Sequence, residues 1–130
     1  MIYEAIKTAV ESVSDLKGVY PTGVCIDEEE FPIAVYTFGK QTAEADLSGE
    51  VHNYTDEVFI DLLSKSYVQL HDLYRRVERA LLALANGADG VGEYIFGVSC
   101  GSPEADAADL PIGLMRRTLQ CSIQWCELTE

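Results

Sequence analysis

The most constraining feature of the sequence is the stretch RRTLQCSIQWCEL, residues 116–128, in which the side chains alternate in character. One parity is apolar and comprises Leu119, Cys121, Ile123 and Trp125. The other parity is polar and comprises Thr118, Gln120, Ser122 and Gln124. Because successive side chains of a β-strand point to opposite faces, this pattern predicts a strand with one buried face. The second face is unusual for a chain with 22 acidic residues, because it carries no charge.

Two stretches have the three- and four-residue apolar spacing of an amphipathic helix. The first covers residues 2–16 and is ended by Gly18. The second covers residues 66–85, where Ser66 is a suitable N-cap and the Asn-Gly pair that follows is a C-terminal stop. We expect both helices to bury one face.

Runs rich in β-branched and aromatic residues, bounded by turn residues, predict the strands. They lie at residues 19–26, 31–39, 54–64, 93–100 and 116–128, and the polar stretch 40–53 is either a hairpin partner or a loop. The element order is therefore α-β-β-β-α-β-β. This order predicts an α+β fold in a single domain, residues 1–130, with a largely antiparallel or mixed sheet of four to five strands packed by both helices on one face.

The charge of the chain is strongly acidic and unevenly distributed. The net charge is −13, and only nine Lys and Arg residues are spread along the sequence. A surface that holds nucleic acid needs clustered basic residues, so stable nucleic-acid binding is not expected. Between Asp27 and Asp61 there are ten acidic residues, and Lys40 is the only basic residue. This part of the chain is expected to present an acidic surface.

Residues that could carry chemistry do not form a recognisable site. The glycines at 87, 90 and 92 follow a helix and precede a strand, the reverse of the order that presents amide groups to a phosphate. His71 and Asp72 are adjacent on a helix, so their side chains diverge by roughly 100°. The DEEE run at 27–30 lacks the alternating ligand spacing of a calcium loop. We therefore predict no catalytic residues, no cofactor and no metal site.

Cysteine spacing and the N-terminal sequence bear on the compartment. Cys25, Cys100, Cys121 and Cys126 show no C-x-x-C spacing, and we expect them to be reduced. The first eighteen residues carry charges every few positions and have no continuous apolar core. Neither a signal peptide nor a membrane span is expected, so the protein is predicted to be made in the cytosol.

Four stretches together carry a resemblance to a known family. They are GVYP (18–21), FPIAVYTFG (31–39), VFIDLLSKSYVQLHDLYRRVERALL (58–82) and RRTLQCSIQW (116–125). The pattern is a proline-initiated strand, a strand that enters an amphipathic helix through a short polar turn, and a terminal amphipathic strand. Over about four-fifths of the chain it resembles the small tail-completion and tail-terminator proteins of long-tailed bacteriophages and prophages. The chain departs from that family in its heavy acidity and in its long 86–113 segment.

The resemblance implies a structural role without catalysis. Members of that family are α+β subunits that form rings, typically hexamers, which cap the tail tube and join it to the head. The implied partners are other copies of the chain, the phage tail tube and the head-completion or neck proteins, with no membrane. The implied location is the virion, after assembly in the cytoplasm of the bacterial host.

The uncharged face of the terminal strand is our candidate subunit interface, formed by Thr118, Gln120, Ser122 and Gln124. Such a face can hydrogen-bond to a neighbour without burying charge. A strand of this length spans about 40 Å, so we expect it to bend at a bulge or to project beyond its own sheet. The alternative is a solvated sheet face that happens to lack charge.

The acidic part of the chain is a second candidate surface, formed by Asp27, Glu28, Glu29, Glu30, Glu44, Asp46 and Glu50. In a ring it could line the lumen, where negative charge lets DNA slide because no phosphate contacts form. It could instead face a basic surface of a partner. The alternative is that it only keeps the protein soluble.

Two other functions compete with the tail-terminator role. A head-closure or neck subunit shares the ring geometry but docks on the portal side, and sequence does not separate the two. A small ligand-binding or enzymatic α+β domain is the rival from another class, with a site built from Cys25, His52 and the acidic 27–61 region. A deep pocket with convergent polar groups would favour that rival.

Overall fold

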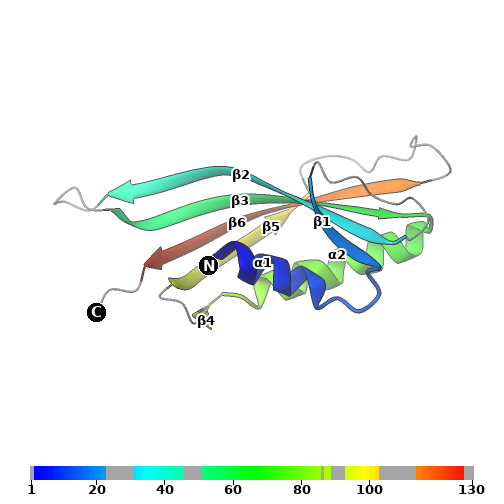
Figure 1. Cartoon of the computed structure of the whole chain (residues 1–130), viewed down its shortest axis with the longest axis horizontal. Helices are drawn as coiled ribbons and strands as arrows, with labels where there is room; N and C mark the ends of the chain where they lie inside the picture. Colours follow the sequence, from blue (N-terminus) through cyan, green and yellow to red (C-terminus); the bar gives the residue numbers. More distant parts are fainter. Residues whose placement is uncertain are drawn as a thin grey trace.

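A computed structural model describes residues 2–22, 31–45, 51–85, 87–88, 93–102 and 114–127, and shows one mixed β-sheet with two helices against one face (Figure 1). The elements are α1 (Ile2–Glu11), β1 (Gly18–Pro21), β2 (Ile33–Ala45), β3 (Val51–Ser64), α2 (Tyr67–Leu82), β4 (Gly87–Ala88), β5 (Glu93–Gly101) and β6 (Met115–Glu127). This confirms the α+β class and the predicted order, to which the structure adds the two-residue strand β4.

The strand order is β1-β2-β3-β6-β5-β4, in which β1 runs parallel to β2 and all other neighbours are antiparallel. The polar stretch 40–53 is a hairpin partner, because β2 continues to Ala45 and pairs with β3 from Val51 onward. Both edges of the sheet are short strands, of four and two residues.

The terminal strand β6 lies inside the sheet, which corrects the expectation that it bends at a bulge or projects beyond the sheet. It pairs with β3 in unbroken register from Asn53 opposite Cys126 to Ser64 opposite Met115. The physical reason is that β3 is long enough to pair with β6 along its length, with 14 residues against 13. The irregularity on its other side falls in β5, where Phe96 interrupts the register.

The hydrophobic core lies between the sheet and the helices. The apolar parity of β6 is buried as predicted, with Leu119, Cys121 and Ile123 fully inaccessible to solvent. The helices contribute buried side chains at Ile6, Val10, Leu70, Leu73, Tyr74, Val77 and Leu81. The N-cap of α2 is as predicted, since the Gln69 amide donates to Ser66 Oγ at 3.3 Å. No helix among the described residues is long and apolar enough to cross a membrane.

Helix α1 is shorter than the apolar spacing predicted. It ends at Glu11, although Val13 and Leu16 still pack against the core from the turns that follow. Turn residues can therefore continue an apolar spacing that began on a helix. Helix α2 ends at Leu82, three residues before the predicted end.

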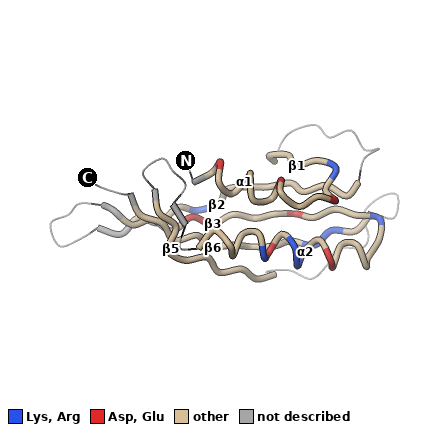
Figure 2. The backbone as a smooth tube through the Cα atoms, turned by 90° about the horizontal axis from the view of Figure 1, so that it is seen from below, with Lys and Arg blue, Asp and Glu red and all other residues tan. Residues whose placement is uncertain are grey.

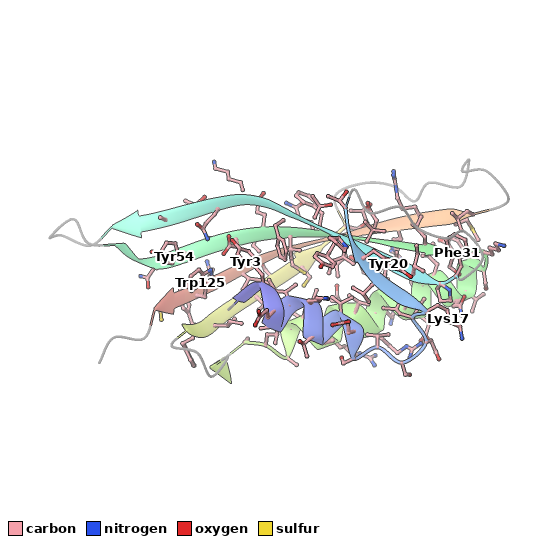
Figure 3. The ribbon with its side chains drawn as sticks, in the orientation of Figure 1. Tyr3, Lys17, Tyr20, Phe31, Tyr54 and Trp125 are labelled. Atoms are coloured by element: carbon pink, nitrogen blue, oxygen red, sulfur yellow. The ribbon has the colours of Figure 1, made fainter. Side chains whose placement is uncertain are left out.

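A buried polar contact closes the core at the end of the sheet where Tyr54 and Trp125 lie (Figure 3). The two rings stack with centroids 4.5 Å apart. The Trp125 indole Nε1 donates to Asp56 Oδ2 at 2.6 Å, and Gln41 Nε2 donates to the same oxygen at 3.1 Å. Asp56 is only 3% exposed, so these donors replace the water that its carboxylate would otherwise bind.

Replacing Trp125 with Ala should lower the free energy of unfolding by about 3–5 kcal/mol, because it leaves a large cavity and removes one donor from Asp56. Urea denaturation followed by circular dichroism measures the change. The control is Val68→Ala on the 79% exposed side chain of α2, which should change stability by less than about 0.5 kcal/mol. Equal stabilities of the two variants would show that Trp125 is not a core residue.

Candidate subunit interface

The sheet face opposite the two helices is the candidate functional surface, and no helix of the described residues lies over it (Figure 1). We call it the open face. Residues directly opposite each other on paired strands share a face, so the register of β6 identifies the neighbours of its polar parity. The open face comprises Thr118, Gln120, Ser122 and Gln124 of β6, Glu57, Phe59 and Asp61 of β3, and Ser99 and Gly101 of β5.

The four predicted interface residues lie on one face but differ in exposure. Thr118 is only 7% exposed, because its hydroxyl donates to Asp61 Oδ1 at 2.6 Å. Its carbonyl oxygen accepts from Ser102 Oγ at 3.1 Å. Gln120 and Ser122 are half-buried, and Gln124 is exposed. The side chains available to a partner are therefore those of Gln120, Ser122 and Gln124, while Thr118 supports the sheet.

The open face as a whole carries charge, which the alternation within β6 does not indicate. Glu57 lies opposite Ser122, and Asp61 lies opposite Thr118. The available signal was the parity of residues 54–64, in which both carboxylates alternate with the buried Val58 and Ile60. The uncharged row of β6 is thus flanked by an acidic row on β3.

A hollow of about 310 Å³ opens beside this row. It is lined by Ser99, Cys100, Gly101, Ser102, Gln120 and Ser122. Small side chains on β5 leave this space next to the longer Gln120. Such a hollow can receive a side chain from a neighbouring molecule, and its lining offers hydroxyl and amide groups for hydrogen bonds.

Cys100 and Cys121 face each other across β5 and β6, with their sulfur atoms 2.6 Å apart. Both thiols are free in the structure, as is that of Cys126. The hydrogen bond with Cys100 and then burial raise the pKa of the Cys121 thiol, which keeps it protonated. Cys121 therefore acts as a small buried apolar group in the core.

A second hollow, of about 260 Å³, lies on the helix side. It is lined by His71, Tyr74, Arg75, Glu78, Arg79 and Arg117, and we call it the basic hollow. Arg117 Nη1 lies 2.7 Å from His71 Nδ1, and its guanidinium sits 4.3 Å from the centre of the Tyr74 ring. Burial, and then Glu78, raise the pKa of Tyr74, and Arg117 opposes them.

His71 and Asp72 diverge on α2, as the sequence indicates. His71 turns to Arg117, and Asp72 Oδ2 pairs with Arg76 Nε at 3.1 Å. Arg76 also pairs with Asp15 beyond the end of α1. None of these arginines was predicted as a site residue, and the sequence signal for them is the four-residue spacing of Arg75 and Arg79 on one helix face.

Most of the candidate acidic surface lies outside the described residues. Residues 27–30, Asp46, Glu50 and Cys25 are not described, and for Glu44 and His52 only the backbone is placed, in β2 and β3. Within the described ranges no group of His, Cys, Asp or Glu is arranged to hold a metal ion. The basic hollow and the open-face hollow are both open to solvent rather than deep pockets.

Comparison with known proteins establishes the fold and no more. No protein-family model matches the chain, and no curated protein matches its sequence significantly. Among solved structures, the chain is similar to a chain of the structure described as "Virion of native gene transfer agent (GTA) particle". The TM-score is 0.61 at 12% sequence identity, and the match covers 96% of this chain and 91% of that chain. The two chains share a fold over nearly their whole lengths.

Replacing Thr118 with Val should lower the free energy of unfolding by about 1–3 kcal/mol, because the Asp61 carboxylate loses a donor in a partly desolvated position. Thr118→Ser keeps the hydroxyl and should cost less. Chemical denaturation of the three proteins measures both changes. If the Thr118→Val variant had the same free energy of unfolding as the wild type, the hydrogen bond to Asp61 would contribute nothing to stability.

Proposed function

We propose that the protein is a structural subunit of a phage-like particle and that it forms a ring of the tail-completion or tail-terminator kind. The observation that carries the proposal is the fold shared with a chain of a gene transfer agent virion over 96% of this chain. The proline-initiated strand and the passage from strand to helix through a short turn support the same assignment. Fold similarity alone does not identify a function, so the proposal also rests on the surfaces of the subunit.

The open face is the proposed contact between neighbouring subunits. Gln120 and Gln124 each offer both donors and an acceptor, and Ser122 offers a hydroxyl. The pairing of β6 with β3 holds these side chains on a rigid sheet, so little conformational freedom is lost when a neighbour binds. The hollow beside Gln120 gives the contact a shape that a flat sheet lacks.

The ring is proposed to be a homohexamer that binds the phage tail tube and the head-completion or neck proteins. Its location is the virion, after assembly in the bacterial cytoplasm, and it has no catalytic role. A head-closure or neck ring is the alternative within the same class. The position of the ring in a particle separates the two.

Light scattering on the purified protein tests self-association. We expect a closed oligomer, with about six times the 14.3 kDa mass of the chain, at high protein concentration or when tail tube is added. A chain that stays at 14.3 kDa under both conditions would contradict the proposed ring.

Replacing Gln120 and Gln124 together with Glu should weaken association and leave the monomer folded. The new carboxylates join Glu57 and Asp61 on the same face and would be desolvated against a neighbour that is itself acidic. Light scattering measures the association, and circular dichroism confirms the fold.

The matched control places two Glu residues on the helix side, at the exposed Tyr67 and Val68. This control should associate like the wild type, because the first turn of a helix accepts negative charge. If the Gln120 and Gln124 variant associated as well as this control, the open face would be a solvated surface.

A further inference from the structure

Cys100 and Cys121 form a pair of thiols on β5 and β6, the two strands that build the open-face hollow. The strands lie side by side (Figure 2), and the two cysteines are directly opposite each other in their register. Opposite residues of antiparallel strands have Cα atoms about 4.5–5.5 Å apart, which is within the range that a disulfide spans. The two sulfur atoms are 2.6 Å apart, so the side chains already point toward each other.

The third described cysteine, Cys126, has no thiol opposite it. It lies on β6 opposite Tyr94 of β5, and its odd spacing from Cys121 turns it to the other face of the sheet. Cys25 lies outside the described residues. Among the cysteines that the structure describes, only the opposed pair is therefore placed to form a bond.

The two thiols of the pair differ in access and acidity. Cys100 is half-buried, whereas Cys121 has no exposed surface. The hydrogen bond with Cys121 lowers the pKa of the Cys100 thiol, against the effects of burial and of Glu78. The thiolate is the form of cysteine that attacks a disulfide. Cys100 is therefore the sulfur that meets a reagent first.

The pair lies in a part of the sheet that is held from one side. The second half of β5, Gly97–Gly101, pairs with β6, and among the described strands its other edge is unpaired, because β4 reaches only Tyr94 and Ile95. Strand segments with such exposed backbone groups open locally more readily than central strands. The hollow is lined only by this half of β5, the residue after it and β6, so a bond between the strands would fix its wall.

We propose that Cys100 and Cys121 are an oxidation site, at which a small-molecule disulfide, met outside the reducing cytosol, joins them in a cross-strand disulfide that fixes β5 on β6. In the cytosol the pair stays reduced, because thiol-reducing systems there keep such bonds open. The inference does not depend on the proposed ring.

The reaction proceeds in two exchanges with a reagent RSSR. Cys100 attacks one sulfur of the reagent, forms a mixed disulfide with one RS group and releases one RSH. The modified Cys100 can no longer form a thiolate that hydrogen-bonds to Cys121, which removes the largest cause of the raised pKa of Cys121. Cys121 then attacks the Cys100 sulfur and releases the second RSH. Two electrons pass to the reagent, and both thiol protons end on the released thiols.

Peptide mapping after oxidation tests the proposal. Trypsin leaves Cys121 and Cys126 on one peptide, residues 118–130, so the bond is mapped in a Cys126→Ser variant. The folded variant is incubated with oxidised glutathione, its remaining thiols are alkylated, and the peptides are identified by mass spectrometry. The matched control is Cys121→Ala, which keeps one cysteine on each of the same two peptides. Oxidation of the Cys126→Ser variant in urea gives a second reference, in which its three thiols pair without the guidance of the fold.

We expect most of the folded Cys126→Ser protein to link residues 80–116, which contain Cys100, to residues 118–130. The Cys121→Ala control should show no such link, and the protein in urea should give a mixture of links. The linked form should unfold at a temperature at least about 5 °C higher than the same protein after reduction with dithiothreitol, because the bond constrains the unfolded chain.

Three results would overturn the inference. The first is a folded Cys126→Ser protein that stays unlinked, or that links Cys25 instead. The second is a folded Cys121→Ala control that links the two peptides equally well through Cys126. The third is a linked protein that unfolds at the same temperature as its reduced form, because the bond would then not fix β5 on β6.

Discussion

The pairing of β3 with β6 is the interaction on which the rest of the structure depends. Twelve consecutive residue pairs join the two strands without a shift, and both strands are central in the sheet. This register places Val58, Ile60, Leu119 and Ile123 together beneath the helices, where all four are fully buried. A slip of β6 by one residue against β3 would turn Leu119 and Ile123 to the open face and bury Gln120 instead. The core and the candidate interface are therefore two consequences of one register.

Much of the fold could be predicted from the sequence because local patterns agreed with the tertiary structure. The alternation in residues 116–128 identified both faces of β6, and Ser66 identified the start of α2. The prediction that β6 bends at a bulge or projects beyond the sheet was wrong. No pattern within the strand indicates that β3 pairs with it along its length. The predicted end of α1 was also wrong, because Val13 and Leu16 pack against the core without being helical.

The candidate sites were less predictable, since each is assembled from separate parts of the chain. Asp61 and Thr118 are far apart in sequence and meet only through the β3–β6 register. Likewise, Arg117 reaches Tyr74 only when α2 packs on the sheet. The basic hollow is likewise a product of folding, because its arginines come from both α2 and β6.

The two faces of the sheet have different roles in this account. The helix side contains the core and the basic hollow, and the open face offers a rigid row of uncharged polar groups. A subunit of a closed ring needs two unlike surfaces that fit each other, and the open face is the one proposed here. The measurement that tests the central claim most directly is cryo-electron microscopy of a particle that carries the protein. The account predicts a closed ring at the tail end or head–tail junction, with Gln120 and Gln124 against the neighbouring subunit. A particle in which the chain forms no ring, or in which both side chains face solvent, would contradict it.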